Sequence, residues 1–209
     1  RCTSRGLGDV YKRQAKNVGE TTLSTTLVYG DYKISTIEHL LSALAGTGVD
    51  NCIIDCDGPE IPIMDGSSTQ FVFLIQTAGI VEQNAVKKFV YVTKSVQVQR
   101  DDAVARIKPY DGFRVTFTLE FDHPVYNKYP HSASIDFSQT SFIREVSRAR
   151  TFGLMDDLEK LKKMNLALGA NLNNAIGIGD EDVLNAVSNT HLTLPAIAVV
   201  EWSVGAGGG

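Results

Sequence analysis

Apolar residues recur with helical spacing in the segment 35–46, which reads STIEHLLSALAG. The spacing of three and four positions places them on one face of a helix, and we expect the buried stripe to consist of Ile37, Leu40, Leu41, Leu44 and Ala45. Gly46 and Gly48 end the pattern. Before it, two short runs rich in β-branched residues flank Gly30-Asp31 and predict a β-hairpin.

A buried strand and a second helix are predicted next. The run VDNCIIDCDG at 49–58 is continuously apolar at its centre, as in a buried strand. Prolines and the Asp65-Gly66 pair mark the following residues as a loop. We expect Ser67 to cap the second helix, with Gln70 completing a capping box. The buried stripe of this helix is expected to be Phe71, Leu74, Ile75 and Ala78.

Beyond residue 86 the pattern changes to alternation of apolar and polar positions. It predicts strands at 87–99, 103–110, 113–121 and 131–137, helices at 141–149 after a cap at Ser141 and at 154–165, and a last short strand within 174–185. Because strands and helices are mixed without regular βαβ alternation, we expect the α+β class. We place a first subdomain at 15–85 and a second at 86–185, joined near Glu82–Lys87.

The two ends of the chain differ from the rest. Residues 1–14 lack helical or strand periodicity, and residues 186–209 have weak strand character and end in a glycine run. Both resemble translated adapter or vector sequence, so we expect them to lie outside the native fold, and His191 and Trp202 receive no role. The sequence therefore predicts an internal fragment of a longer protein.

Composition narrows the function classes. The 209 residues are 43% apolar and 21% charged, as in a globular protein with a core, and the net charge of −4 argues against nucleic acid as a partner. No apolar run approaches the roughly 18 residues of a membrane span, so we expect a cytoplasmic monomer. Cys52 and Cys56 are too widely spaced for a CxxC redox pair, and we expect both to be core residues.

Glu38 and His39 are the first candidate chemical groups. At about 100° per residue, His39 lies nearly opposite Ile37, so it is either a solvated histidine or a residue that faces a cleft. Glu38 has two interpretations, because Ser35-x-x-Glu38 also matches a capping box. The pattern alone favours the cap, and it does not match the HExxH signature of metalloproteases.

The surrounding motifs carry more information than the pair itself. STIEHLLSALAGTGVDN at 35–51, DGPEIPIMDGSSTQF at 57–71 and SRARTFG at 147–153 closely resemble the UDP-3-O-acyl-N-acetylglucosamine deacetylases. These are zinc amidases of lipid A synthesis in Gram-negative bacteria. The resemblance runs from about Thr22 to Asn185 and includes KKFV, KPYDGF, FDHP and DVLN in order. It implies two α+β subdomains, each a mainly antiparallel sheet with helices, with the helices sandwiched between the sheets.

The resemblance also implies roles for particular residues. His39 would be one of three Zn²⁺ ligands, and Glu38 the general base for a zinc-activated water that attacks the acetamide. The Thr151 hydroxyl would stabilise the oxyanion, although Thr151 could simply end a helix. Phe152 and Leu154 would line the sugar and acyl region and Phe121 the acyl passage, although Phe121 could equally be a core residue of a strand.

The chain departs from the family at its second metal motif. The family completes the zinc site with His-Lys-x-x-Asp followed by a histidine that acts as general acid, and neither His123, His131 nor His191 begins such a motif. We therefore expect both subdomains to be incomplete and this polypeptide alone to be inactive, because zinc sites use three or four protein ligands. The alternative is a non-catalytic relative that binds the acylated nucleotide sugar. Fusion of the parent to an acyl-carrier dehydratase also stays open.

A basic cluster lies close to the SRARTFG motif. Arg144, Arg148 and Arg150 could bind the diphosphate of a UDP-linked substrate. An exposed, solvated helix face explains the same pattern, and the sequence favours this second interpretation.

Overall fold

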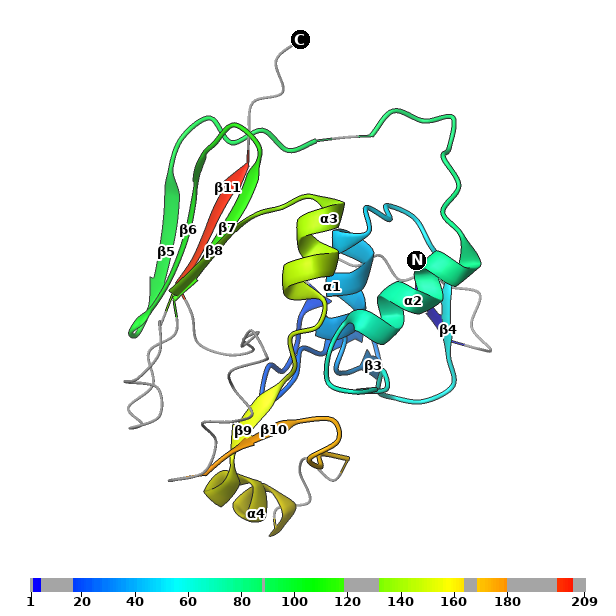
Figure 1. Cartoon of the computed structure of the whole chain (residues 1–209), viewed down its shortest axis with the longest axis vertical. Coiled ribbons are helices and arrows are strands. Elements are labelled where there is room, and N and C mark those ends of the chain that lie inside the picture. Colours follow the sequence, from blue (N-terminus) through cyan, green and yellow to red (C-terminus); the bar gives the residue numbers. More distant parts are fainter. Residues whose placement is uncertain are drawn as a thin grey trace.

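The computed structural model describes residues 2–4, 17–87, 89–118, 132–163, 169–179 and 199–204 (Figure 1). Its helical segments are α1 (Glu38–Gly46), α2 (Thr69–Ala78), α3 (Gln139–Ser141), the π-helical turn η3 (Phe142–Val146) and α4 (Met155–Lys163). Its strands are β1 (Cys2–Ser4), β2 (Leu27–Tyr29), β3 (Tyr32–Ile34), β4 (Ile54–Cys56), β5 (Val96–Arg100), β6 (Ala103–Pro109), β7 (Phe113–Thr118), β8 (Ser132–Asp136), β9 (Phe152–Leu154), β10 (Ile176–Ile178) and β11 (Val199–Val204). This mixture confirms the predicted α+β class.

The predicted hairpin is present. Strands β2 and β3 pair antiparallel, with Val28 opposite Lys33. Gly30 takes φ of +56° in the connecting turn, a conformation that glycine adopts without a steric penalty.

The core forms where α1, α2 and η3 meet. One cluster of buried apolar side chains comes from these elements and from the segments before α1 and after β4: Ile37, Leu40, Ala43, Leu44, Ile61, Phe71, Val72 and Phe142. Figure 1 shows α3 beside α1, although they are far apart in sequence. Gly46 makes this approach possible, because a Cβ at that position would overlap the ring of Phe142. The core therefore combines both predicted subdomains, and the proposed boundary at residues 85–86 stays a prediction.

The buried faces of the two long helices differ in part from the predicted stripes. In α1, Ala45 is exposed and Ala43 is buried, and Leu41 is only half-buried. In α2, Phe71 and Val72 are buried, whereas Leu74 and Ala78 are exposed. A fixed periodic template misses these positions because α1 begins later than residue 35, and because α2 faces α1 with its first turn.

The predicted helix caps were also wrong in position. The residue before α2 is Ser68, which makes no side-chain cap, although the Ser67 hydroxyl accepts a hydrogen bond from the Thr69 amide at 3.1 Å. The cap of α3 is Ser138 rather than Ser141, and these two serines form a reciprocal capping box. The observed cap of α3 therefore lies three residues before the predicted one, and the residue before α2 provides no side-chain cap.

The largest sheet has five strands in the order β5-β6-β11-β7-β8. Strand β11 pairs parallel with β6 and antiparallel with β7, while β5–β6 and β7–β8 are antiparallel. Strand β5 begins only at Val96, so the predicted strand from 87 was too long. The rings of Phe113, Phe137 and Phe142 contact one another in tilted arrangements and connect the sheet to the core, with centroid separations of 5.2 and 6.2 Å.

Two strands lie inside the foreign-looking ends. Strand β1 pairs parallel with β4, and β11 belongs to the five-stranded sheet. The origin of these end segments stays a prediction. Within the described ranges, no helix is long and apolar enough to cross a membrane.

Candidate active site

Glu38 is the first residue of α1, and its carboxylate is held from outside the helix. Its Oε2 accepts a hydrogen bond from the Thr25 amide at 3.0 Å, just before β2. The predicted capping box with Ser35 is therefore wrong. Ser35 instead pairs with the segment after β4, because its amide donates to the Pro59 carbonyl at 3.0 Å and its own carbonyl accepts from the Ile61 amide at 3.0 Å. This long-range pairing keeps Ser35 out of the helix.

The turn between Ser35 and Glu38 is strained. Thr36 has φ of +56°, a conformation that costs a β-branched residue about 1–2 kcal/mol. Its hydroxyl donates to the Glu60 carboxylate, which offsets part of this cost. Leu23 and Met64 also have positive φ, at +60° and +55°. These three residues lie next to the site segments around Thr25, Glu38 and Asp65, and backbone strain of this kind clusters at functional sites.

His39 is half-buried rather than fully solvated. Burial lowers the pKa of its imidazole, and the carboxylates of Glu38 and Asp65 partly oppose this effect. The net direction favours the neutral ring, which is the form that binds metals. The half-buried ring differs from the fully solvated histidine of the first alternative, and a cleft at His39 stays a prediction.

Asp65 is a site residue that the sequence interpretation missed. Its carboxylate lies close enough to His39 to affect the pKa of the imidazole. Oδ1 accepts hydrogen bonds from the amide and hydroxyl of Ser67 at 3.1 and 2.9 Å, and these bonds fix its orientation. The Met64-Asp65-Gly66 motif was visible in the sequence, but Asp65-Gly66 was interpreted only as a turn.

Thr151 lies at a meeting point of three segments. Its amide donates to the Gly66 carbonyl at 2.8 Å, and its carbonyl accepts from the Ile176 amide at 2.9 Å. It precedes β9 and does not end a helix, since η3 ends at Val146. The helix-end interpretation of Thr151 is therefore wrong. The connection to Gly66 brings Thr151 to the same loop as Asp65.

Two of the predicted substrate-lining residues, Phe152 and Leu154, come directly after Thr151 in the sequence. Phe152 and Leu154 are half-buried residues of β9, where they alternate with Gly153 and so share one face of the strand. Strand β9 pairs parallel with β10. Each strand has only three residues, and β9 was not predicted. Phe121 lies outside the described residues.

The donor set fits part of a metal site. His39 supplies an imidazole beside two carboxylates, which are ligand types that zinc accepts. No group of three or more histidine, cysteine or acidic side chains in the described ranges could hold a metal ion. His123, His131 and His191 lie outside those ranges. Cys52 and Cys56 were predicted to be core residues, and both are half-buried and packed against the core.

The basic cluster divides into two kinds of residue. Arg144 and Arg148 are exposed, as the solvated-face interpretation expects. Arg150 is not part of that face. Its Nε donates to the Asp65 carbonyl at 2.8 Å and its Nη2 donates to the Asn173 carbonyl.

Comparison with known proteins gives a consistent result. The family model described as "LpxC: UDP-3-O-acyl N-acetylglycosamine deacetylase" matches residues 3–191. The chain is 58% identical over 169 residues to a UDP-3-O-acyl-N-acetylglucosamine deacetylase of Methylococcus capsulatus, covering 81% of this chain and 56% of the relative. It is 57% identical over 172 residues to the enzyme of the same name from Hahella chejuensis, covering 82% and 57%. The chain thus spans little more than half the length of these relatives.

Proposed function

Because the chain belongs to the UDP-3-O-acyl N-acetylglycosamine deacetylase family, we propose that it is part of an enzyme that removes acetate from UDP-3-O-acyl-N-acetylglucosamine. This hydrolysis is the committed step of lipid A biosynthesis in Gram-negative bacteria. The proposal includes a zinc cofactor, a cytoplasmic location and a monomer whose partner is this small-molecule substrate. The observation that carries it is the pair Glu38-His39 at the start of α1, with the Glu38 carboxylate engaged by Thr25 and not by a helix cap.

His39 would supply one imidazole ligand to the zinc ion. The lowered pKa of His39 supports this role, because the neutral ring has a free electron pair for a metal. When bound, zinc polarises the amide carbonyl and lowers the pKa of the attacking water to about 7. The remaining ligands are not among the described residues.

Glu38 would act as the general base. The Thr25 amide holds Oε2 at 3.0 Å, which leaves the other oxygen to accept a proton from the attacking water. The carboxylate cannot rotate freely while this bond is present.

Thr151 would stabilise the negative charge that develops on the amide oxygen. Its hydroxyl makes no hydrogen bond to other residues in the described part of the chain. Its main chain is tied on both sides, to Gly66 and to Ile176. A donor held in this way costs little reorganisation during the reaction. Phe152 and Leu154 on β9, together with Phe121, would contact the sugar and the acyl chain.

The test compares Glu38→Ala and Ser35→Ala in the full-length protein that contains this chain. We expect Glu38→Ala to keep its zinc and to lose about 10²- to 10⁴-fold in kcat, the usual contribution of a general base. We expect Ser35→Ala to stay within about threefold of wild type, because Ser35 bonds to Pro59 and not to Glu38. Turnover near wild type in Glu38→Ala would contradict the proposal.

The 209-residue polypeptide itself should not turn over substrate. Its sequence contains one candidate zinc ligand in a family motif and no His-Lys-x-x-Asp. Elemental analysis that finds one catalytic zinc per chain would overturn this expectation. A full-length protein that binds the acylated nucleotide sugar without hydrolysing it would instead support the non-catalytic alternative.

A further inference from the structure

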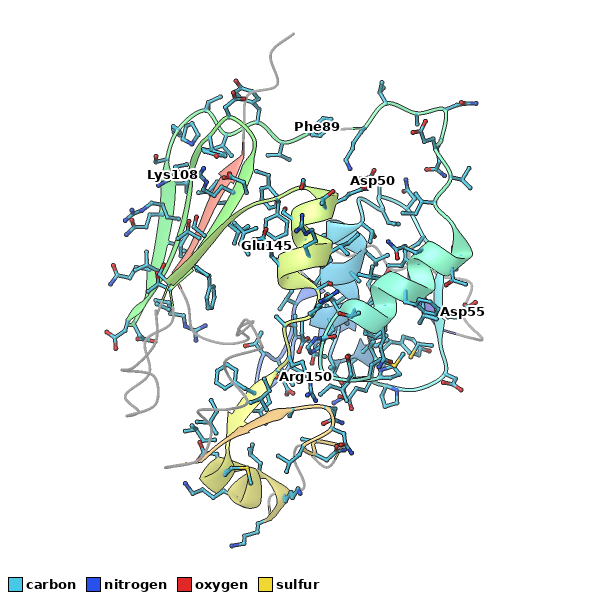
Figure 2. The ribbon with its side chains drawn as sticks, in the orientation of Figure 1. Asp50, Asp55, Phe89, Lys108, Glu145 and Arg150 are labelled. Carbon is cyan, nitrogen blue, oxygen red and sulfur yellow. The ribbon has the colours of Figure 1, made fainter. Side chains whose placement is uncertain are left out.

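Arg150 connects two loops that are distant in the sequence. Its Nε donates to the Asp65 carbonyl at 2.8 Å, and its Nη2 donates to the Asn173 carbonyl on the other side. Figure 2 labels Arg150 where the chain passes from the helices toward β9. Hydrogen bonds from a charged donor are about twice as strong as neutral ones. A single half-buried side chain therefore joins two stretches of main chain.

The backbone around Arg150 joins the same two loops. Thr151 donates to the Gly66 carbonyl and accepts from the Ile176 amide. Gly66, with φ of +81°, is buried so closely that an added Cβ would overlap the carbonyl oxygen of Asn174 and lie 3.2 Å from Cγ2 of Thr151. The main chains of the Gly66, Thr151 and Asn174 segments are therefore in direct contact. A shift of either loop is expected to move Thr151.

The two loops flank Thr151, which has a role in the proposed reaction. Asp65 lies in the first loop, with its carboxylate fixed by Ser67. Thr151 lies between the loops, next to Arg150 in sequence. The guanidinium directs two of its five N–H donors to main-chain carbonyl oxygens, so these bonds hold neighbouring segments in place. It acts on the placement of its neighbours.

We propose that Arg150 is a positioning residue, whose guanidinium fixes the Asp65 and Asn173 loops on either side of Thr151. This assignment rests on the proposed deacetylase function. Arginine suits the task because its planar fork directs two donors to two separate acceptors, whereas the lysine ammonium is a single point charge. The basic cluster thus contains a structural clamp at Arg150 beside the solvated Arg144 and Arg148.

The kinetic test uses Arg150→Ala, Arg150→Lys and the control Arg148→Ala in the full-length protein. A misplacement of about 1 Å costs on the order of 100-fold in rate, so we expect Arg150→Ala to lose about that factor in kcat, with KM changed by less than about threefold. Zinc content should stay at the wild-type level. Arg150→Lys should be intermediate, added methylguanidinium should restore part of the kcat of Arg150→Ala, and Arg148→Ala should match wild type.

Hydrogen exchange separates this proposal from the function on which it rests. In Arg150→Ala, and to a smaller degree in Arg150→Lys, the amides of Thr151 and Ile176 should exchange faster, while the amide of Leu41 in α1 should not change. This result is expected even if the wild-type protein proves to have no deacetylase activity. Unchanged exchange at Thr151, or a kcat within twofold of wild type in Arg150→Ala, would overturn the positioning role.

Discussion

The side chains that connect α1 with the neighbouring helices are buried, whereas the five-stranded sheet has a more exposed surface. All five residues of its strand β5 are exposed. In the first region, Phe142 is 1% exposed and Ala43 is 0% exposed. In the sheet, side chains of β7 pair at the surface with side chains of β8: Arg114 with Asp136, Thr116 with Ser134 and Thr118 with Ser132. The first region is stabilised by apolar burial, and the second by ladder hydrogen bonds and polar cross-strand pairs.

This difference explains where the candidate site lies. Glu38, Asp65 and Thr151 come from segments that border the apolar core, where neighbouring main chains are closely packed. Catalytic geometry requires side chains held to within a fraction of an ångström, and such precision needs a rigid support. The tightly packed region provides that support. The comparison predicts three graded effects of mutation.

The largest effect should follow the loss of Phe142. Replacing this buried ring with alanine should reduce the free energy of unfolding by about 3–5 kcal/mol, through lost burial and the cavity left behind. The matched control is Phe73→Ala, because Phe73 on α2 is 67% exposed and should change stability by less than about 0.5 kcal/mol. Urea unfolding of both variants measures the difference. Equal losses would refute the contrast between buried and exposed positions.

An intermediate effect is expected at Gly46. Gly46→Ala places a methyl group into the ring of Phe142, and such overpacking costs about 1–3 kcal/mol of unfolding free energy. Gly153→Ala is the control, because a Cβ there meets nothing within 4 Å. Thermal or urea unfolding should show no comparable loss for the control. A Gly46→Ala variant as stable as wild type would contradict this prediction, because it would show that the Phe142 ring can move aside without cost.

The smallest effect should come from the sheet surface. Hydrogen bonds from Arg114, and then from Tyr110, hold the pKa of Asp136 below its usual value. A depressed carboxyl pKa adds stability above the unfolded pKa of about 3.9, and this stability is lost as pH falls through the lower folded value. Asp136→Asn should therefore lower the urea midpoint slightly at pH 7 and not at pH 2.

Salt provides the second half of that experiment. Asp136 and Arg114 are exposed, so added salt should screen their attraction and shrink the difference between wild type and Asp136→Asn. The Phe142→Ala effect should persist in the same salt, because apolar burial is not screened. An Asp136→Asn effect that does not change with salt would show that the carboxylate contributes through packing.

Local patterns predicted the elements better than their boundaries. Gly30-Asp31 identified the hairpin because a two-residue turn is encoded within a few positions. The Ser35 cap failed because Ser35 pairs with Pro59 and Ile61, a contact that no local pattern contains. Strand β9 escaped notice for the same reason, since its parallel partner β10 follows only after α4 and the strand has three residues, whereas β10 lies within the strand predicted at 174–185.

The residues of the candidate site also fall into two groups, those found from local motifs and those placed by long-range contacts. Glu38, His39 and Thr151 were found through motifs that resemble a known family, and their roles stay predictions. Asp65 was missed because its place beside His39 depends on how its loop packs against residues 150–151 and 173–176. The sequence placed Arg150 on a solvated face because cationic faces are common on ordinary helices, whereas its guanidinium bonds to distant main chain. In both cases the deciding contacts are with distant main chain.

Gly66 has a consequence for the genetics of this protein. Every missense change that one nucleotide can make in a glycine codon introduces a side chain with a Cβ. At Gly66 that atom would collide with the carbonyl oxygen of Asn174, which belongs to the main chain, whereas at Gly46 it would meet a side-chain ring, which can give way at a cost in stability. In a saturation-mutagenesis library selected for growth, codon 66 should therefore tolerate synonymous changes alone, while codon 46 should still accept alanine at a reduced level.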